Sequence, residues 1–290
     1  MGTKIISVYT QKGGAGKTTT SWLLGEALTY CSSAEKEIKV LCIDNDRQRN
    51  LTITLLSEEV QKEHKESLLN VLKDGAPISE NILTTRFSNL HIVPASSELD
   101  SIEVKGHELK KALDPFVTGE FKDYYDFIII DNNPSMKTGL NTASLLAADT
   151  VLVPYLPELY GFKGLVDSVR YIKDTMKHLQ IIIVPVRVKN TSTAFAYVNA
   201  AMETFPELIT NSKVPEAQEV ETIKTKKGSL FMKTKSKVAD AILDLIEEKF
   251  NYSKMSVETE IARQRTKRKK EQAISNLSRA RKVNMGKRGE

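Results

Sequence analysis

A glycine-rich loop close to the start of the chain constrains the fold more than any other feature of the sequence. It lies between a short apolar run and a helical pattern, and its residues are Gln11, Lys12, Gly13, Gly14, Ala15, Gly16, Lys17, Thr18 and Thr19. In a strand–loop–helix unit, glycines let backbone N–H groups turn inward around phosphate oxygens, because no Cβ stands in the way. The N-terminus of the helix adds partial positive charge. The loop therefore predicts a phosphate-binding site in a fold of alternating strands and helices.

The side chains of the loop indicate which phosphates it binds. Lys17 is placed to reach the β- and γ-phosphates of a nucleoside triphosphate, and the Thr18 hydroxyl is placed to ligate Mg²⁺. Thr19 is placed to contact the α-phosphate. Loops of this type usually carry a further glycine five residues before Gly16; this loop lacks it and has an added lysine, Lys12. A glycine turn formed by chance is the alternative, and the number of specified residues disfavours it.

Composition places the chain among globular proteins. Its 290 residues are 40% hydrophobic and 27% charged, which excludes the disordered and low-complexity classes. Two cysteines, Cys31 and Cys42, cannot form a disulfide framework or a four-cysteine cluster. The apolar runs are far shorter than the ~20 residues needed to cross a bilayer, and the chain starts without a signal-peptide pattern. We therefore expect a cytoplasmic protein.

Short apolar runs alternate with helical patterns over most of the chain, which is typical of βαβ units. The expected strands are Ile5–Tyr9, Val40–Ile43, Leu90–Val93, Phe127–Ile130, Val151–Val153 and Ile181–Val186. Because these runs are almost continuously apolar, both faces of the sheet must be covered. The fold class is therefore α/β, a doubly wound, mostly parallel sheet with helices on both faces. Apolar periodicity fades after Phe250, which predicts one domain over residues 1–250 and a basic tail, helical or disordered, over 251–290.

Carboxylates stand at the carboxyl ends of two of these strands. Asp44 and Asp46 follow the second strand, and Asp131 ends the strand that begins at Phe127. Open α/β sheets bind ligands at that edge. An apolar strand ending in Asp is the Walker B pattern, so Asp131 would hold Mg²⁺ through water. For the segment from Asp44 to Asn50, a helix cap or a turn is the alternative interpretation.

Together these motifs resemble those of the ParA/MinD family of P-loop ATPases, whose phosphate loop is a deviant Walker A motif with an extra lysine. Lys12 stands at that position. The family motif Asp-x-Asp-Pro-Gln-Gly-Asn is kept at Asp44, Asp46, Gln48 and Asn50 but carries Arg47 and Arg49 in place of proline and glycine. The resemblance covers about residues 3–250 and is strongest over the first 165.

The resemblance implies a mechanism and partners. In the family, the extra lysine, here Lys12, crosses an ATP-bound sandwich homodimer to the phosphates of the opposite subunit. Lys12, Lys17 and Asp46 would be the catalytic residues, with Asp46 orienting the attacking water. Asp44 would support the Mg²⁺ shell together with Thr18 and Asp131. The expected activity is a slow, Mg²⁺-dependent hydrolysis of ATP that a ParB-like, centromere- or cargo-binding activator stimulates.

After Asp131, the chain departs from the family pattern. Asn132 and Asn133 replace the first two residues of the usual Cys- or Thr-Pro-Pro-Ser, while Pro134 and Ser135 remain. This change bears on the rate of hydrolysis more than on nucleotide binding. The closest resemblance is to ParA-type, Soj-like partition ATPases that lack an amino-terminal DNA-binding domain.

Basic residues are concentrated late in the chain. The net charge of +5 divides into +8 after residue 250 and −3 before it. Such cation density favours sequence-independent, salt-sensitive binding of double-stranded DNA, and a solvated face is the alternative. The residues that we expect to bind DNA are Lys224, Lys226, Lys227, Lys233, Lys235, Arg265, Lys267 and Arg268.

Other functions on the same scaffold remain open at this stage. A MinD-like regulator would need an amphipathic membrane helix, but the apolar residues of the tail are widely spaced, so no stable membrane association is expected. A nitrogenase-reductase-like enzyme would need cysteines at a dimer interface, which Cys31 and Cys42 do not supply. An ATPase that positions a non-DNA cargo is a further alternative. We expect a DNA-partition ATPase that is associated with the nucleoid.

Overall fold

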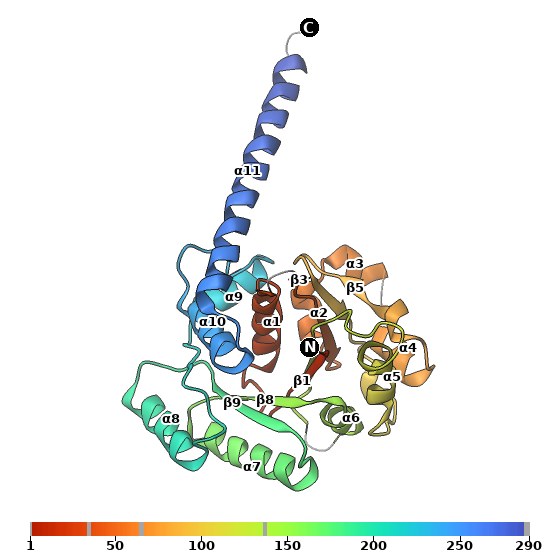
Figure 1. The fold of residues 1–290 in the computed structure, drawn as a ribbon, viewed down its shortest axis with the longest axis vertical. Coiled ribbons are helices and arrows are strands. Elements are labelled where there is room, and N and C mark those ends of the chain that lie inside the picture. Colours follow the sequence, from red (N-terminus) through yellow and green to blue (C-terminus); the bar gives the residue numbers. More distant parts are fainter. Residues whose placement is uncertain (1, 34–35, 64–66, 136–137, 287–290) are drawn as a thin grey trace.

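The computed structural model describes residues 2–33, 36–63, 67–135 and 138–286, with side chains as far as Gln272. A seven-stranded sheet forms its centre (Figure 1), in the order β5-β6-β4-β7-β1-β8-β9. All neighbours are parallel except β5 and β6. The strands are β1 (Lys4–Val8), β4 (Val40–Asn45), β5 (Leu83–Thr84), β6 (Leu90–Val93), β7 (Phe127–Asn132), β8 (Thr150–Tyr155) and β9 (Gln180–Pro185).

The expected strands are confirmed, and the α/β fold class with them. Within this sheet, the two-residue strand β5 was not predicted. Outside it, a small separate hairpin pairs β2 (Ser32–Ser33) with β3 (Lys36–Glu37), and these equally short strands were not predicted either. In the parallel register Asp131 lies beside Val8 on one side and Asp44 on the other, so both carboxylates come to the same edge of the sheet.

Two apolar cores cover the two faces of the sheet, because alternate strand residues point to opposite sides. One core holds Ile6, Cys42 and Ile129, and the other holds their neighbours in sequence Ile5, Ile43 and Ile130.

The helices of the first core are α1 (Lys17–Leu28), α2 (Asn50–Leu55) and α10 (Lys237–Phe250). Those of the second are α4 (Ser67–Lys73), α5 (Glu108–Val117), α6 (Gly139–Ala147), α7 (Leu159–Thr175) and α8 (Ser192–Thr204). Further short elements are α3 (Glu58–Glu63), α9 (Gln218–Thr225), η1 (Ile78–Asn81) and η2 (Leu99–Ser101).

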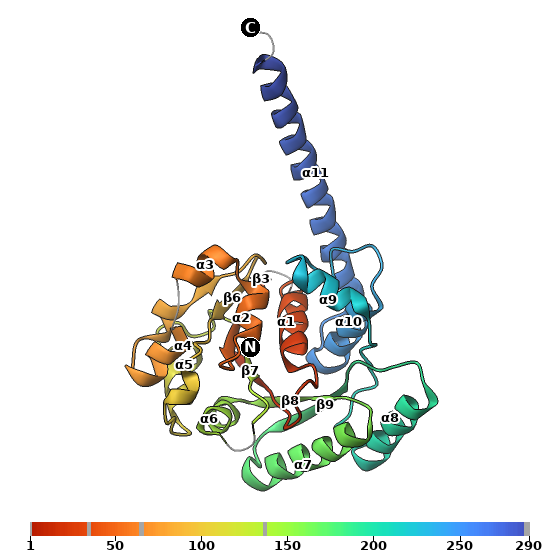
Figure 2. The same cartoon turned by 180° about the vertical axis from the view of Figure 1, so that it is seen from behind.

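The basic tail forms one long helix, α11 (Lys254–Gly286), which projects from the body in both views (Figure 1, Figure 2). Val257 and Ile261, in its first two turns, are buried in the core beside α10. The side chains from Thr266 to Gln272 are exposed. The start of the tail is therefore packed on the domain, and its described continuation is presented to solvent. Nowhere in the described part of the chain is a helix sufficiently long and apolar to traverse a membrane.

Candidate nucleotide-binding site

The glycine-rich loop connects β1 to α1, at the carboxyl edge of the sheet. Gly14 and Gly16 adopt φ values of 72° and 80°, in the left-handed region that glycine reaches without steric cost. Gly16 is the N-cap of α1, so the helix begins at Lys17 with its free N–H groups at the loop. The backbone thus forms the anion-binding turn that the sequence predicts.

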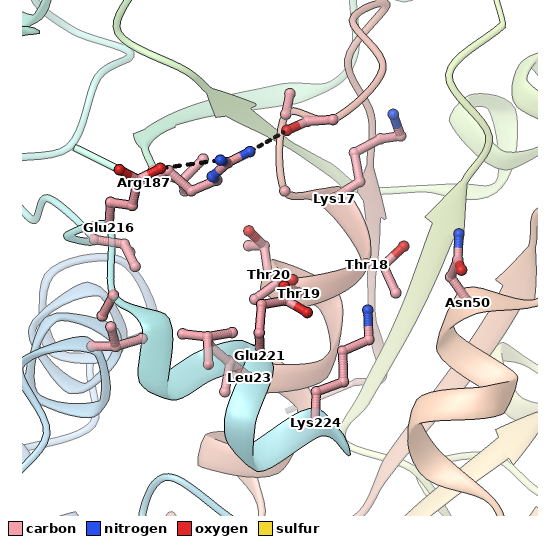
Figure 3. Close-up of a pocket in the computed structure, with 18 of the residues that line it drawn as sticks. Lys17, Thr18, Thr19, Thr20, Leu23, Asn50, Arg187, Glu216, Glu221 and Lys224 are labelled. Atoms are coloured by element: carbon pink, nitrogen blue, oxygen red, sulfur yellow. Dashed lines mark hydrogen bonds and ion pairs between the residues drawn. The ribbon is translucent and has the colours of Figure 1, made fainter. Parts of the chain in front are cut away.

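A cavity of about 810 Å³ opens in front of this loop (Figure 3). Its polar end is lined by the loop from Gly14 to Thr19 together with Asp46, Gln48 and Asn50. Its other end is apolar and is lined by Leu23, Val186, Val214, Ala217, Val220, Val238 and Ile242. A cavity with an anion-binding end and an apolar end matches the phosphates and the base of a nucleotide.

Lys17 is held at the polar end. Its side chain is buried, and its Nζ donates to the carbonyl oxygens of Lys12 at 3.3 Å and of Thr10 at 3.5 Å. Burial lowers the pKa of Lys17, while the charges of Asp131 and Asp46 oppose that shift. Among the described residues, Lys17 Nζ hydrogen-bonds to neutral carbonyls and forms no ion pair, so its charge remains available for a phosphate.

Asp131 has the features of a residue that holds Mg²⁺ through water. Its Oδ1 accepts a hydrogen bond from Ser21 Oγ at 2.9 Å, and its buried Oδ2 has no hydrogen-bond partner. Burial raises the pKa of Asp131, and hydrogen bonds from Thr18 and Ser21 lower it. A free buried carboxylate oxygen beside a threonine hydroxyl fits the oxygen preference of Mg²⁺. In the described part of the chain, no three His, Cys, Asp or Glu side chains form a metal-binding group.

Asp44 and Asp46 have different surroundings, although the sequence places both near the metal. Asp44 is fully buried, and its Oδ2 accepts hydrogen bonds from the backbone N–H and the hydroxyl of Thr52, at 2.8 and 2.7 Å. Its Oδ1 accepts from the Asp46 N–H at 3.3 Å. Burial and the charge of Asp131 raise the pKa of Asp44. Asp44 therefore shapes the turn into α2, and Asp46 is the carboxylate that lines the cavity.

The two arginines that depart from the family motif take separate positions. Arg49 is the N-cap residue of α2 with φ 58°, a left-handed conformation that accounts for the glycine in the family motif. Arg47 forms an ion pair with Asp100 at 3.1 Å, and both side chains are about half exposed. Arg49 thus adopts the left-handed conformation that glycine favours, and Arg47 is paired at the surface.

Asn132 joins three strands at the edge of the site, a role that the sequence did not reveal. Its Nδ2 donates to Ser7 Oγ at 2.9 Å and to the Val8 carbonyl at 3.0 Å, and its Oδ1 accepts from Asn45 Nδ2 at 2.9 Å. The next residue, Asn133, accepts a hydrogen bond from Asn141 Nδ2 at 3.0 Å. Asn132 therefore connects the ends of β1, β4 and β7 beside Asp131, and Asn133 connects the end of β7 to α6.

Lys12 lies at the rim of the site, in an ion pair with Glu158 of the same chain. Its Nζ is 6.0 Å from the centre of the Tyr160 ring. Leu159 and Tyr160, the first residues of α7, are 61% and 73% exposed. Lys12 is therefore held beside an apolar, exposed part of the surface.

The other wall of the cavity comes from Arg187 and from the segment that follows Val214, both far from the loop in the sequence. Arg187 has φ 51° and bridges the two walls, donating to the Gly14 carbonyl at 3.2 Å and to Glu216 Oε1 at 3.0 Å (Figure 3). Helix α9 contributes Glu221 and Lys224. The signal available in the sequence was the polar stretch after Val214, which lies about 200 residues from the loop.

The basic residues that were expected to bind DNA fall into two groups. Lys224 lines the cavity, Lys227 donates to the Ile53 and Leu56 carbonyls, and Lys233 pairs with Glu219 at 3.0 Å. Arg265 donates to the Phe231 carbonyl at 2.9 Å. Lys227, Lys233 and Arg265 are thus already engaged in the fold, whereas Lys224 faces the cavity. The other four are exposed, without hydrogen-bonded or ion-paired side-chain partners among the described residues, and they are Lys226, Lys235, Lys267 and Arg268.

Comparison with known proteins agrees with this geometry. The family model described as an AAA domain matches residues 3–184. The sporulation initiation inhibitor protein Soj of Bacillus subtilis is 36% identical over 184 residues, which are 61% of this chain and 67% of Soj. A ParA family protein of Chlamydia pneumoniae is 34% identical over 226 residues, 73% of this chain and 83% of that protein.

The fold also matches solved structures. A variant of McdA from Cyanothece, in complex with ATP, superposes with a TM-score of 0.72 at 22% identity, over 84% of this chain and 95% of that one. The range matched by the family model includes the glycine-rich loop and the carboxylate-bearing strands. The chain therefore belongs to the ParA family of P-loop ATPases.

Proposed function

We propose that this protein is a ParA-type DNA-partition ATPase, which binds ATP and Mg²⁺ in the cavity, dimerises in that state and then binds duplex DNA without sequence preference. The observation that carries the proposal is that Lys17, Thr18 and Asp46 line one cavity that also has apolar walls. The buried Asp131, which accepts a hydrogen bond from Ser21 of the same helix and has a free Oδ2, supports it. The McdA structure of the same fold contains ATP. The relatives Soj and ParA give the functional class.

Each residue at the polar end has a distinct role in hydrolysis. Lys17 pairs with the terminal phosphates, and the loop N–H groups hold the bridging oxygens. Thr18 and Asp131 would hold Mg²⁺, and the ion would neutralise phosphate charge when bound. Asp46 accepts the Gln48 N–H through Oδ1 at 2.9 Å, and its Oδ2 has no donor among the described residues. That oxygen is available to orient a water molecule and to accept its proton.

Dimerisation would use the surface around Lys12. Lys12 leaves Glu158 and contacts the triphosphate of a second copy, and the exposed side chains of Leu159 and Tyr160 lie on the same face. Exposed apolar side chains beside an exchangeable ion pair are suited to an interface that forms only when ATP is bound. A ParB-like activator would stimulate hydrolysis and return the dimer to single chains.

DNA binding would use the four exposed cations, Lys226, Lys235, Lys267 and Arg268. Contacts of this kind release counterions from the duplex, so the affinity falls steeply with salt and does not depend on sequence. In a cell this places the ATP-bound dimer on the nucleoid.

Co-sedimentation with plasmid DNA and with liposomes, each with ATP, ADP or no nucleotide, tests this function. We expect binding to DNA with ATP only, weakening as salt increases. ATP-dependent binding to liposomes without binding to DNA would contradict the proposal and support a MinD-like function.

A further inference from the structure

Helix α9 forms one wall of the nucleotide cavity. Gln218, Val220, Glu221 and Lys224 all line it, so one side of the helix faces the cavity. The opposite side is fixed to the body, because Glu219 accepts hydrogen bonds from Lys233 at 3.0 Å and from Ser236 Oγ at 2.6 Å. The direction of the Lys224 side chain is therefore set by the packing of α9.

Lys224 extends from α9 toward the side of the cavity that Thr18 and Asn50 line (Figure 3). It is half-buried, and its ammonium has no hydrogen-bond or ion-pair partner in the described residues. Lys227 and Lys233, which follow it in the basic run, are both paired. Lys224 thus differs from its neighbours in being a free cation that faces the cavity.

The charges around the cavity explain what such a cation is suited to bind. Lys17 lies on the loop side, and Arg187 is already paired with Glu216 at 3.0 Å. A nucleoside triphosphate carries about four negative charges, and Lys17 together with one Mg²⁺ balances only about three of them. A second free ammonium on the facing wall supplies the missing charge, and a partly enclosed site strengthens the attraction.

We propose that Lys224 contacts the phosphates of the bound nucleotide rather than DNA. This inference rests on the proposed function in that it takes a nucleotide as the ligand of the cavity. Binding of the nucleotide then fixes Lys224 in the last turn of α9. The exposed Lys226 lies two residues after Lys224. Occupancy of the cavity is thereby connected to the DNA-binding surface through a short segment.

Titration with fluorescently labelled ATP tests the proposal, with Lys224→Met and the matched control Lys226→Met. Methionine keeps the apolar part of the side chain and removes the charge. We expect Lys224→Met to weaken ATP binding about tenfold or more, and Lys226→Met to change it less than about twofold, since one charge-assisted hydrogen bond is worth about tenfold. At saturating ATP, only Lys226→Met should weaken DNA binding.

Two further measurements distinguish the loss of a phosphate contact from a general loss of nucleotide binding. Competition with ATP, ADP and adenosine should show a loss for the phosphate-bearing ligands only, and Lys224→Arg should restore ATP binding. Equal ATP binding by Lys224→Met and the unsubstituted protein, or an equal loss for adenosine, would overturn the assignment. If the unsubstituted protein binds no ATP, it is the proposed function that fails.

Discussion

The ammonium of Lys12 is paired with the carboxylate of Glu158 in the same chain, where the two side chains are 24% and 47% exposed. A pair this exposed contributes at most about 1 kcal/mol, because water and salt screen it. Lys12 can therefore exchange Glu158 for a phosphate at little cost. In the single chain, Lys12 lies at the rim beside Tyr160, in a pair that is weak enough to exchange.

Replacing Lys12 by Gln should separate binding of ATP from dimerisation. The ATP affinity of the single chain should change less than about threefold, and dimerisation with ATP should weaken about thirtyfold or more, as expected for a lost interfacial charge pair. Sedimentation velocity with ATP measures the second effect. The control is Lys173→Gln, an exposed lysine farther along α7. Normal dimerisation of the Lys12 variant would show that another residue holds the two copies together.

Replacing Lys17 by Ala should abolish measurable ATP binding. Its buried ammonium is the cation that the loop holds against the phosphates, and a charged hydrogen bond of this type is worth about 3 kcal/mol, or more than a hundredfold in affinity. Isothermal titration calorimetry is the measurement, with a melting curve to show that the variant is folded. An affinity within tenfold of the unsubstituted protein would exclude Lys17 as the main phosphate ligand.

Replacing Asp46 by Ala should leave ATP binding intact and reduce hydrolysis about a hundredfold or more, because the proton acceptor for the attacking water is lost. Phosphate release over time measures this. Asp100→Ala is a suitable control, since Asp100 is a half-exposed carboxylate near the same loop that pairs with Arg47. Hydrolysis at the unsubstituted rate in the Asp46 variant would show that another group accepts the proton of the attacking water.

Removal of residues 267–290 should lower DNA affinity and flatten its dependence on salt, while ATP binding stays unchanged. This deletion keeps Ile261 in the core and Arg265 on the Phe231 carbonyl, so the body should remain folded. Filter binding at several salt concentrations gives the slope. An unchanged slope would place the DNA surface on Lys226 and Lys235 instead.

Glu26 makes stability depend on pH. It is fully buried on α1, and Trp22 Nε1 and the Tyr30 hydroxyl donate to it at 3.1 and 3.2 Å. Burial raises the pKa of Glu26 to about 7 from 4.5. Ionisation of this buried carboxyl therefore favours the unfolded state. The free energy of unfolding is highest below pH 4.5 and falls as the pH rises through about 7, by about 3 kcal/mol at most.

Denaturation in urea at about pH 5 and about pH 8 checks this dependence. The unsubstituted protein should be less stable at the higher pH, and Glu26→Gln should remove most of the difference. A variant with the same pH dependence as the unsubstituted protein would show that other groups cause it.

The sequence predicted the strands well because they are buried on both faces, and such strands consist of continuous apolar runs. β4 and β7 show this, since each ends at the polar residues that the sequence placed at the site. β5 was missed because it has two residues and pairs antiparallel at the sheet edge, which leaves no periodic signal. The local pattern of apolar residues thus predicts buried strands but does not reveal short strands at the sheet edge.

Half of the candidate site could be predicted, namely the half made by local motifs. The loop around Lys17 and the carboxylate Asp46 are set by the residues next to them in the chain. The wall that carries Lys224 depends on how α9 packs across the cavity, which no spacing in the sequence reveals. The same holds for Asp44, which accepts hydrogen bonds from Thr52 because α2 packs beside the end of β4.

The mass of the Asp46→Ala protein in solution, measured by light scattering with ATP and with ADP, tests the central claim most directly. The account predicts twice the 32.5 kDa of one chain with ATP, and 32.5 kDa with ADP. A mass of 32.5 kDa with ATP fully bound would contradict it.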